Sequence, residues 1–316
     1  MLRPARIEEC AALSDLVLRS KAHWRYSDVF MESCREELAV TPERLAAQPC
    51  RVLERDGRPV AIWALDLSDA VPEVALMFAD PTLIGSGIGH LLWQDMMGEA
   101  RRLGHARIRL DADPNAEPFY ERMGCQRIGS HNSPSTGRML TRYEADATEV
   151  LRTRRLTLRC YAPGEAGALY PILSDPVTMR FWPQPYDRAG VEGWVARWLE
   201  TYRSHGYGRW ALFETATGTR IGDAGLIPTR LMEQDVVDLG YIIHHPYWRQ
   251  GFAEEAATAI RDYSFRVLGL PRLVANMAHD HAGSARVAEK IGMTKVAEFD
   301  NPRNRGIRTL FWEITA

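Results

Sequence analysis

The sequence predicts a layered α/β protein built from two similar domains in tandem, each with a mixed sheet flanked by helices. The chain has 316 residues, a length typical of two domains that each bury their own core. Hydrophobic residues make up 46% and charged residues 25%, which excludes extended disorder. One arrangement of strand, turn and helix also occurs twice at a long period, which indicates an internal repeat.

The first copy begins with an apolar, strand-like segment at 74–78, which leads through Pro81 into a glycine-rich run. Apolar residues at helical spacing follow at Ile88, Leu91, Leu92, Met96 and Leu103. Residues 106–112 then alternate apolar and polar side chains, as in a half-buried strand, and residues 115–124 close the block.

The second copy repeats this order, with a strand-like segment at 239–243 followed by Pro246. The helical positions are Phe252, Ala256, Ile260, Tyr263 and Val267. A strand at 272–277 and the segment 281–292 complete it. Pro81 and Asn115 lie 34 positions apart and Pro246 and His281 lie 35 apart, so the copies agree within one residue. We therefore expect an N-terminal domain at 1–146 and a C-terminal domain at 150–316.

Charge and cysteine content exclude several classes of protein. The net charge of −2 gives no sign of nucleic-acid binding. The five cysteines form no C-x-x-C pair, so neither a disulfide framework nor a zinc site is expected. No apolar run approaches the roughly 18 to 20 residues of a membrane span, and the N-terminus lacks a signal-peptide core. We expect a cytoplasmic protein without membrane contact.

Three alternate glycines, Gly85, Gly87 and Gly89, lie between a predicted strand and a predicted helix. Glycine allows positive φ and close approach of a ligand, while the first helical turn leaves amide N–H groups unpaired. Such a turn can bind a phosphate or pyrophosphate. The run lacks the Lys-Ser/Thr of a Walker loop, and His90 stands where a dinucleotide fingerprint requires glycine. The alternative is a turn that only packs a helix against a sheet.

The runs 78–92 and 111–125 resemble the acetyl-CoA loop and the downstream helix of the GCN5-related N-acetyltransferase (GNAT) superfamily. The second half resembles its ribosomal-protein branch (RimJ/RimL type), through the runs 174–182, 239–256 and 284–292. The resemblance implies two GNAT domains, each with a mostly antiparallel sheet and a splayed central strand pair. It also implies acetyl-CoA as co-substrate and no metal.

In this family, backbone amides of the loop hold the pyrophosphate and the pantetheine arm lies between the splayed strands. The coenzyme-binding positions that the resemblance implies are Ala79, Gly85, Ser86, Gly87, Ile88, Gly89 and Asn115, and in the second domain His244, Arg249, Gln250, Gly251, Phe252, Ala253 and His281. The sequence departs from the family pattern at Ile84, at Arg249 in place of the first glycine, and at His281 in place of asparagine.

The resemblance also implies a proton donor for the departing sulfur. Tyr120, five residues after Asn115, matches the family tyrosine; the alternative is an aromatic residue that packs beside Phe119. The second copy has Arg286 at that position, and the ribosomal-protein branch suggests Ser284 instead. Ser284 could alternatively cap its helix.

A carboxylate occurs at a matched position of both copies: Glu73 lies eight residues before Pro81, and Asp238 lies eight residues before Pro246. Either carboxylate could accept the amine proton through a water, although strand ends often carry solvated carboxylates. The pair His244 and His245 has no third ligand at suitable spacing, so we interpret both as ordinary loop histidines.

The resulting hypothesis is a tandem N-acetyltransferase that moves acetyl from acetyl-CoA directly to a primary amine in a ternary complex. The acceptor is a protein N-terminus or a small molecule, such as a drug. Another short acyl-CoA remains open as donor. The alternative from a different class is a non-catalytic or half-degenerate acyl-CoA sensor or scaffold.

Overall fold

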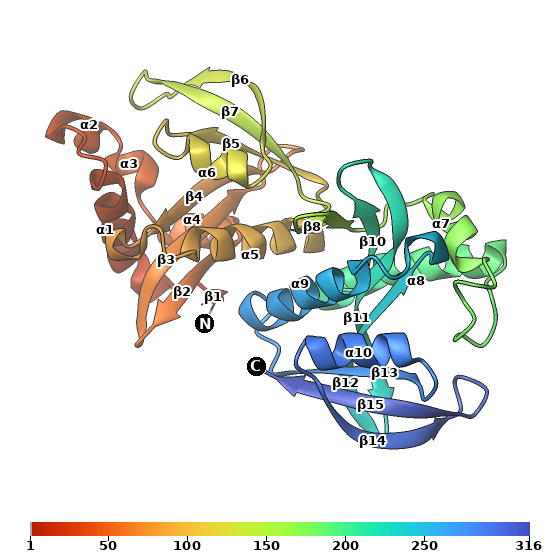
Figure 1. Ribbon diagram of the computed structural model, residues 1–316. Helices are drawn as coiled ribbons and strands as arrows, with labels where there is room; N and C mark the ends of the chain where they lie inside the picture. The colour runs from red at the N-terminus through yellow and green to blue at the C-terminus, as the bar shows by residue number, and fades with distance from the viewer. Residues whose placement is uncertain (1) are drawn as a thin grey trace. The chain divides into compact units, whose positions relative to one another are not determined.

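The computed structural model describes residues 2–316, which fold as two compact units that divide between Ala147 and Thr148 (Figure 1). Each unit contains one mixed sheet with helices on both faces, which confirms the predicted fold class. None of the helices formed by residues 2–316 has the length and hydrophobicity that a membrane crossing requires.

A seven-stranded sheet forms the centre of the first unit, in the order β1-β2-β3-β4-β5-β7-β6. Its strands are β1 (Leu2–Pro4), β2 (Cys50–Arg55), β3 (Arg58–Asp66), β4 (Glu73–Ala79), β5 (Arg107–Ala112), β6 (Gln126–Asn132) and β7 (Met139–Asp146). Neighbouring strands are antiparallel except β4 and β5, which are parallel.

Helices cover both faces of this sheet because side chains alternate between its faces. The helical elements are η1 (Ile7–Glu9), α1 (Cys10–Ala22), α2 (Asp28–Ser33), α3 (Arg35–Leu38), α4 (Pro42–Ala47), η2 (Pro81–Leu83), α5 (Ile88–Arg102) and α6 (Glu117–Arg122). Ile62 of β3 shares a buried cluster with Leu16 of α1. Its neighbour Trp63 shares another with Leu92 of α5. Thus α1 and α5 cover opposite faces.

An eight-stranded sheet forms the second unit, in the order β14-β15-β13-β12-β11-β10-β9-β8. Its strands are β8 (Glu149–Arg152), β9 (Leu156–Arg159), β10 (Arg209–Glu214), β11 (Thr219–Leu231), β12 (Gln234–Ile243), β13 (Arg272–Ala278), β14 (Thr294–Asn301) and β15 (Ile307–Thr315). Only β12 and β13 are parallel neighbours.

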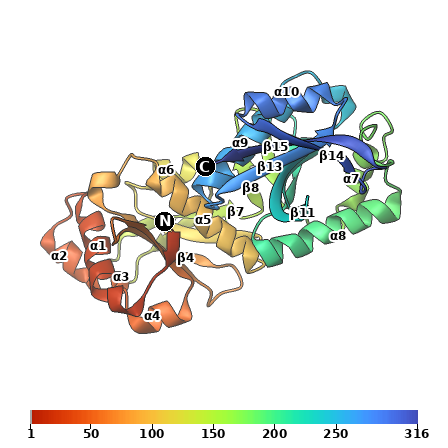
Figure 2. The ribbon, with the colours of Figure 1, turned by 90° about the horizontal axis from the view of Figure 1, so that it is seen from below.

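The helices of the second unit also lie on both faces of its sheet (Figure 2). They are α7 (Ala166–Leu173), α8 (Arg188–His205), η3 (His245–Tyr247), α9 (Phe252–Arg266) and α10 (Ala282–Lys290). Trp194 of α8 donates a hydrogen bond to Asp223 of β11, whereas Tyr263 of α9 packs edge-on against Trp210 of β10. The Trp194, Trp198 and Tyr202 stripe of α8 is buried.

The parallel pair is splayed in both units. The β4–β5 ladder consists of one registered pair, Glu73 with Arg109, and the β12–β13 ladder of one pair, Asp238 with Val274. Both strands of each pair continue for several residues beyond this point without further pairing. Each sheet therefore holds a wedge-shaped gap between two parallel strands, with a carboxylate residue where the wedge closes.

Candidate active site

A helix N-terminus lies just beyond the open end of each wedge. In the first unit, the turn after η2 places Gly85 and Gly87 in the left-handed region, at φ 83° and 86°. Gly87 precedes the first residue of α5 and offers no side-chain cap. Among residues 2–316, the amides of Gly87, Ile88 and Gly89 have no acceptor within the protein, as expected for a first helical turn. The Ser86 amide, in contrast, donates to Leu83 O at 3.2 Å.

The second unit has the same turn despite its different sequence. Arg249 adopts φ 61° and Gly251 φ 81°, matching the two left-handed positions of the first unit. The amides of Gly251, Phe252 and Ala253 likewise lack an acceptor among residues 2–316. A non-glycine residue at φ > 0 is uncommon. Its presence at Arg249 indicates that the surrounding chain imposes the path of this turn.

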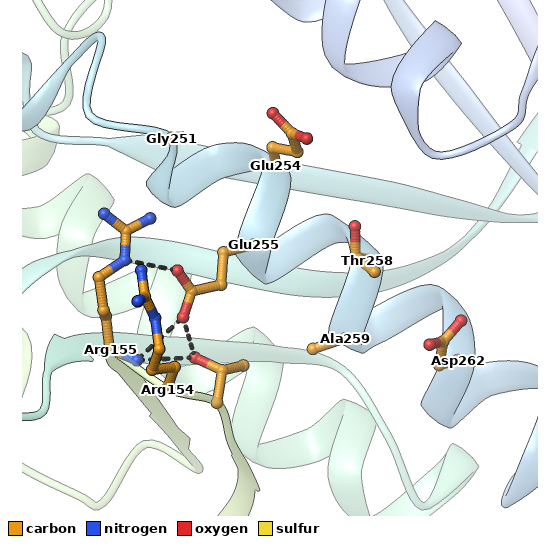
Figure 3. A pocket seen from close by; sticks show the side chains of 9 residues that line it. Arg154, Arg155, Gly251, Glu254, Glu255, Thr258, Ala259 and Asp262 are labelled. Atoms are coloured by element: carbon orange, nitrogen blue, oxygen red, sulfur yellow. Dashed lines mark hydrogen bonds and ion pairs between the residues drawn. The ribbon is translucent and has the colours of Figure 1, made fainter.

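A fixed cation lies beside the second turn. Arg155 pairs with Glu255 at 2.7 Å and donates from Nη1 to Gln250 O at 2.9 Å, with its guanidinium 4.6 Å from the Phe252 ring centroid. Figure 3 shows Arg155 and the neighbouring Arg154 at the edge of an open pocket of about 560 Å³ along α9. Glu254, Glu255 and Asp262 also line this pocket, and Glu255 neutralises Arg155. An anion at the α9 N-terminus would therefore depend mainly on the free amides and on Arg154.

The third glycine of the first turn has a packing role. A Cβ added to Gly89 would come within 3.1 Å of the Phe119 ring. Gly89 therefore allows α5 to pack closely against α6. Its amide remains available to a ligand, since the contact involves only the side-chain direction.

The two matched carboxylates differ in their environments. Glu73 forms an ion pair with Arg142 (Oε1 to Nη2, 3.3 Å), and Arg142 also binds Asp111 through two 2.8 Å hydrogen bonds. The Glu73 side chain is 34% exposed. An incoming amine would therefore have to compete with a guanidinium for Glu73.

Asp238, in contrast, is 7% exposed, and its Oδ1 has no hydrogen-bond partner among residues 2–316. Its Oδ2 accepts a 2.9 Å hydrogen bond from Asn276 of β13. Burial raises the pKa of Asp238 to about 7, against the opposing effects of Asn276 and Arg209. This carboxylate can thus gain or lose a proton near neutral pH, and one of its oxygens is free to do so.

Asp238 lies on the α8 face of its sheet. Gly240 lies two residues further along β12, so its Cβ direction is on the same face as the Asp238 side chain. A Cβ added to Gly240 would come within 2.6 Å of Arg209 Nη1. Arg209 in turn lies 5.2 Å from the Trp194 ring of α8. Arg209 is itself buried and paired with Asp223. Tyr241 points to the opposite face, where it interacts with Ser284 of α10. The wedge is therefore lined by a carboxylate on one face and hydroxyl groups on the other.

His281 fixes the orientation of Ser284. It precedes the first residue of α10, and its Nδ1 accepts from the Ser284 amide at 3.3 Å. Its Nε2 lies 3.2 Å from Ser284 Oγ, and its ring stacks on Phe181 at 3.8 Å between centroids. Burial, aided by Arg180, lowers the pKa of His281 to about 4. The neutral ring therefore carries its proton on Nε2 and donates it to Oγ, which leaves the serine hydroxyl proton free.

In the first unit, Tyr120 is buried on the α5 face. Its hydroxyl lies 4.0 Å from Met77 Sδ of β4, and its ring packs against Trp93 and Phe119. Burial raises the pKa of Tyr120, so its proton is retained at neutral pH. Asn115 turns its side chain elsewhere, donating from Nδ2 to Tyr26 Oη at 2.8 Å. No local pattern in the sequence connects Asn115 with Tyr26, which lies 89 positions away.

Ala79 is the last residue of the splayed strand β4, and His244 directly follows the splayed strand β12. Asp175 lies beside the two histidines, with ligand atoms of Asp175, His244 and His245 within 4.8 Å of one another. Asp175 Oδ2 already accepts from His245 Nδ1 at 2.7 Å and from the Thr178 amide at 2.8 Å. These contacts tie the segment before Arg180 and Phe181 to η3. Asp175 could not be associated with the histidines from local sequence patterns, because it lies 70 positions from His245.

Comparison with known proteins identifies both units. Acetyltransferase (GNAT) domain models match residues 14–145 and 155–294. The chain is 31% identical over 149 residues to the uncharacterized protein YkkB of Bacillus subtilis (strain 168), covering 47% of this chain and 87% of that protein. It is 27% identical over 152 residues to the uncharacterized N-acetyltransferase YoaA of the same organism, covering 46% and 83%.

Among solved structures, the spermidine N-acetyltransferase from Vibrio cholerae, in complex with CoA and spermine, is similar with a TM-score of 0.44 and 18% identity. The match covers 52% of this chain and 96% of that chain. The two matched units define a tandem acetyltransferase architecture. The chain belongs to the GNAT acetyltransferase family, which confirms the resemblance found in the sequence.

Proposed function

We propose that each unit binds acetyl-CoA and transfers its acetyl group directly to a primary amine, of a protein N-terminus or of a small molecule. The observation that carries this proposal is the wedge between two parallel strands, with free helix amides at its open end and a carboxylate where it closes. The free amides of Gly87 to Gly89, and of Gly251 to Ala253, suit a pyrophosphate. The unpaired edges of the wedge suit an extended amide-containing arm.

The second unit offers the clearer catalytic arrangement. Asp238 on the α8 face would accept the proton that the attacking amine loses, directly or through a water. Ser284 on the α10 face would donate a hydrogen bond to the departing sulfur, assisted by His281. The new bond joins the amine nitrogen to the acetyl carbon, and the carbon–sulfur bond breaks. Acceptor and coenzyme would thus approach from opposite faces, so that both can be bound at once in a ternary complex.

In the first unit, Glu73 and Tyr120 would take the corresponding roles. Tyr120 keeps its proton at neutral pH and can donate it to the sulfur. Glu73 must exchange its contact with Arg142 for one with the amine or a water. An acceptor α-amine has an unperturbed pKa of about 7.7 to 8.0, so a weakly engaged base is sufficient.

Release of free thiol from acetyl-CoA, measured with a panel of primary amines, tests the proposal. We expect amine-dependent thiol release that needs both substrates together. Asp238→Asn combined with Tyr120→Phe should abolish most of it while coenzyme binding persists. Saturable acetyl-CoA binding without release on any amine would instead support a sensor or scaffold.

A further inference from the structure

A compact ionic cluster lies at the α1 side of the first wedge. Asp113, directly after β5, accepts hydrogen bonds from Lys21 Nζ at 2.8 Å and from Tyr26 Oη at 2.7 Å. Arg138, from the β6–β7 connection, donates to Tyr26 Oη at 3.0 Å and lies 3.8 Å from Asp113. Tyr26 stacks near Phe30 at 4.5 Å between centroids. The two cations lie 5.5 Å and 5.2 Å from the Tyr26 centroid.

This cluster borders the open end of the wedge. The last turn of α1 spans that end: Arg19 pairs with Asp80, which follows β4, at 3.5 Å, and Lys21 pairs with Asp113, which follows β5. Asn115 joins the cluster through Tyr26, and the charge of Asp113 acts on the Tyr120 hydroxyl. Since α1 and α5 cover opposite faces, the cluster lies on the face away from the turn that precedes α5.

The cluster leaves several hydrogen-bond donors of its two cations unused. Lys21 and Arg138 contribute two cations, and Asp113 neutralises one. Within residues 2–316, Lys21 Nζ donates to Asp113 alone, and Arg138 Nε and Nη2 donate to no protein atom. Glu37 of α3 accepts a hydrogen bond from Ser135 of the same β6–β7 connection and contacts neither cation among the same residues. Arg138 is 33% exposed, so these donors are accessible.

We propose that Lys21 and Arg138 form a subsite for an anionic group of the acceptor, so that the first unit acts on primary amines that also carry a carboxylate or a phosphate. This inference rests on the proposed function of that unit. Charge-assisted hydrogen bonds from two fixed cations favour such an acceptor. The same two cations repel a polyamine, whose additional ammonium groups would lie beside them.

Matched acceptors in the full-length chain test the subsite. The second unit is disabled by Asp238→Asn with Ser284→Ala, and thiol release is measured with an amino acid against its amide, and with O-phosphoethanolamine against ethanolamine. We expect kcat/KM for the anionic member of at least one pair to exceed that for the neutral member about 10-fold or more. The preferred pair distinguishes a carboxylate from a phosphate.

Variants locate the preference in the structure. Arg138→Gln keeps a donor for Tyr26 but removes the charge, and should reduce the preference; Arg138→Lys should retain part of it. Arg58→Gln, at an exposed arginine of β3, is the matched control and should leave it unchanged. The subsite is overturned if both neutral acceptors are used as well as, or better than, their anionic partners. It is also overturned if the preference survives in the double variant Arg138→Gln with Lys21→Met. In either case the proposed transferase activity still stands. No acetylation of any member would overturn the proposed function of this unit.

Discussion

At the scale of single residues, the contrast between Asp238 and Glu73 governs the expected pH dependence. Asp238 is buried, has a free oxygen and titrates near neutral pH, whereas Glu73 is held by Arg142. A general base acts only when it is deprotonated. The rate of the second unit should therefore rise as the pH increases through about 7. Initial rates of thiol release between pH 5.5 and about 9 would measure this limb.

Asp238→Asn should lower turnover by about 10²-fold or more and remove that limb of the pH profile. The substitution preserves the shape of the side chain and an acceptor oxygen for Asn276, so the fold should persist. Asp235→Asn, at an exposed carboxylate of the same strand, is the control. Tyr120→Phe in the same chain confines the measurement to the second unit. A profile unchanged by Asp238→Asn would exclude Asp238 as the base.

His281 should act through Ser284 and not on the coenzyme alone. His281→Asn retains a cap for α10 but loses the Nε2 donor to Ser284 Oγ. We expect a lower kcat with little change in KM for acetyl-CoA. In a Ser284→Ala background the same substitution should have almost no further effect on kcat, which a double-mutant cycle measures. Additive losses would indicate that the two residues act independently.

Burial of Asp238 also affects folding. Its folded-state pKa of about 7 exceeds the unfolded value of about 3.9, so the folded unit binds more protons between these values. The contribution of Asp238 to the free energy of unfolding is fully present below about pH 4 and is lost as the pH rises through about 7. Asp238→Asn should flatten this dependence in urea unfolding measured at pH 5 and pH 8. An unchanged dependence would contradict a raised pKa.

At the scale of elements, the turn before each helix is the feature that a substitution can test most directly. Gly251 needs its left-handed backbone, and an added Cβ would approach Arg155 Nη2 to 3.4 Å. Gly251→Ala should strain the turn by about 1–2 kcal/mol and weaken coenzyme binding several-fold. Gly218→Ala imposes similar strain at φ 68° in a turn between β10 and β11. Calorimetry should show normal affinity for that control; equal loss in both variants would argue against the turn as the binding site.

The elements could be predicted from the sequence because their signals are local. Helical spacing from Ile88 onward, the glycines before α5 and α9, and the matched positions of Glu73 and Asp238 all lie within one repeat. The ionic cluster of Lys21, Tyr26, Asp113 and Arg138 could not be predicted in this way. Lys21 and Asp113 are 92 positions apart, and Tyr26 and Arg138 are 112 apart. The order of strands in the sheet brings these residues together, and no periodicity in the sequence encodes that order. The stacking of Phe181 on His281 was missed for the same reason.

At the scale of the whole chain, the repeat raises the question of how many coenzymes bind. Both turns have the same pair of left-handed residues and free first-turn amides, although one contains Arg249 and the other Gly85. Because amides provide most of the contacts to a pyrophosphate, the substitution of one side chain should change affinity more than stoichiometry. We therefore expect two acetyl-CoA molecules per chain, with different affinities, in a calorimetric titration.

Substitution of one turn at a time assigns these two binding events. Gly87→Trp should leave one site, with the affinity of the second unit, because the bulky side chain obstructs a turn in which φ is 86°. Gly251→Trp should leave the other. Gly104→Trp, at an equally left-handed turn position with no neighbouring atom within 4 Å, is the control and should bind two. The contrary result would be a wild-type chain that binds one coenzyme, with all binding lost in one of the two variants. Since both wedges are formed alike, the other copy would then retain the fold without a functional binding site.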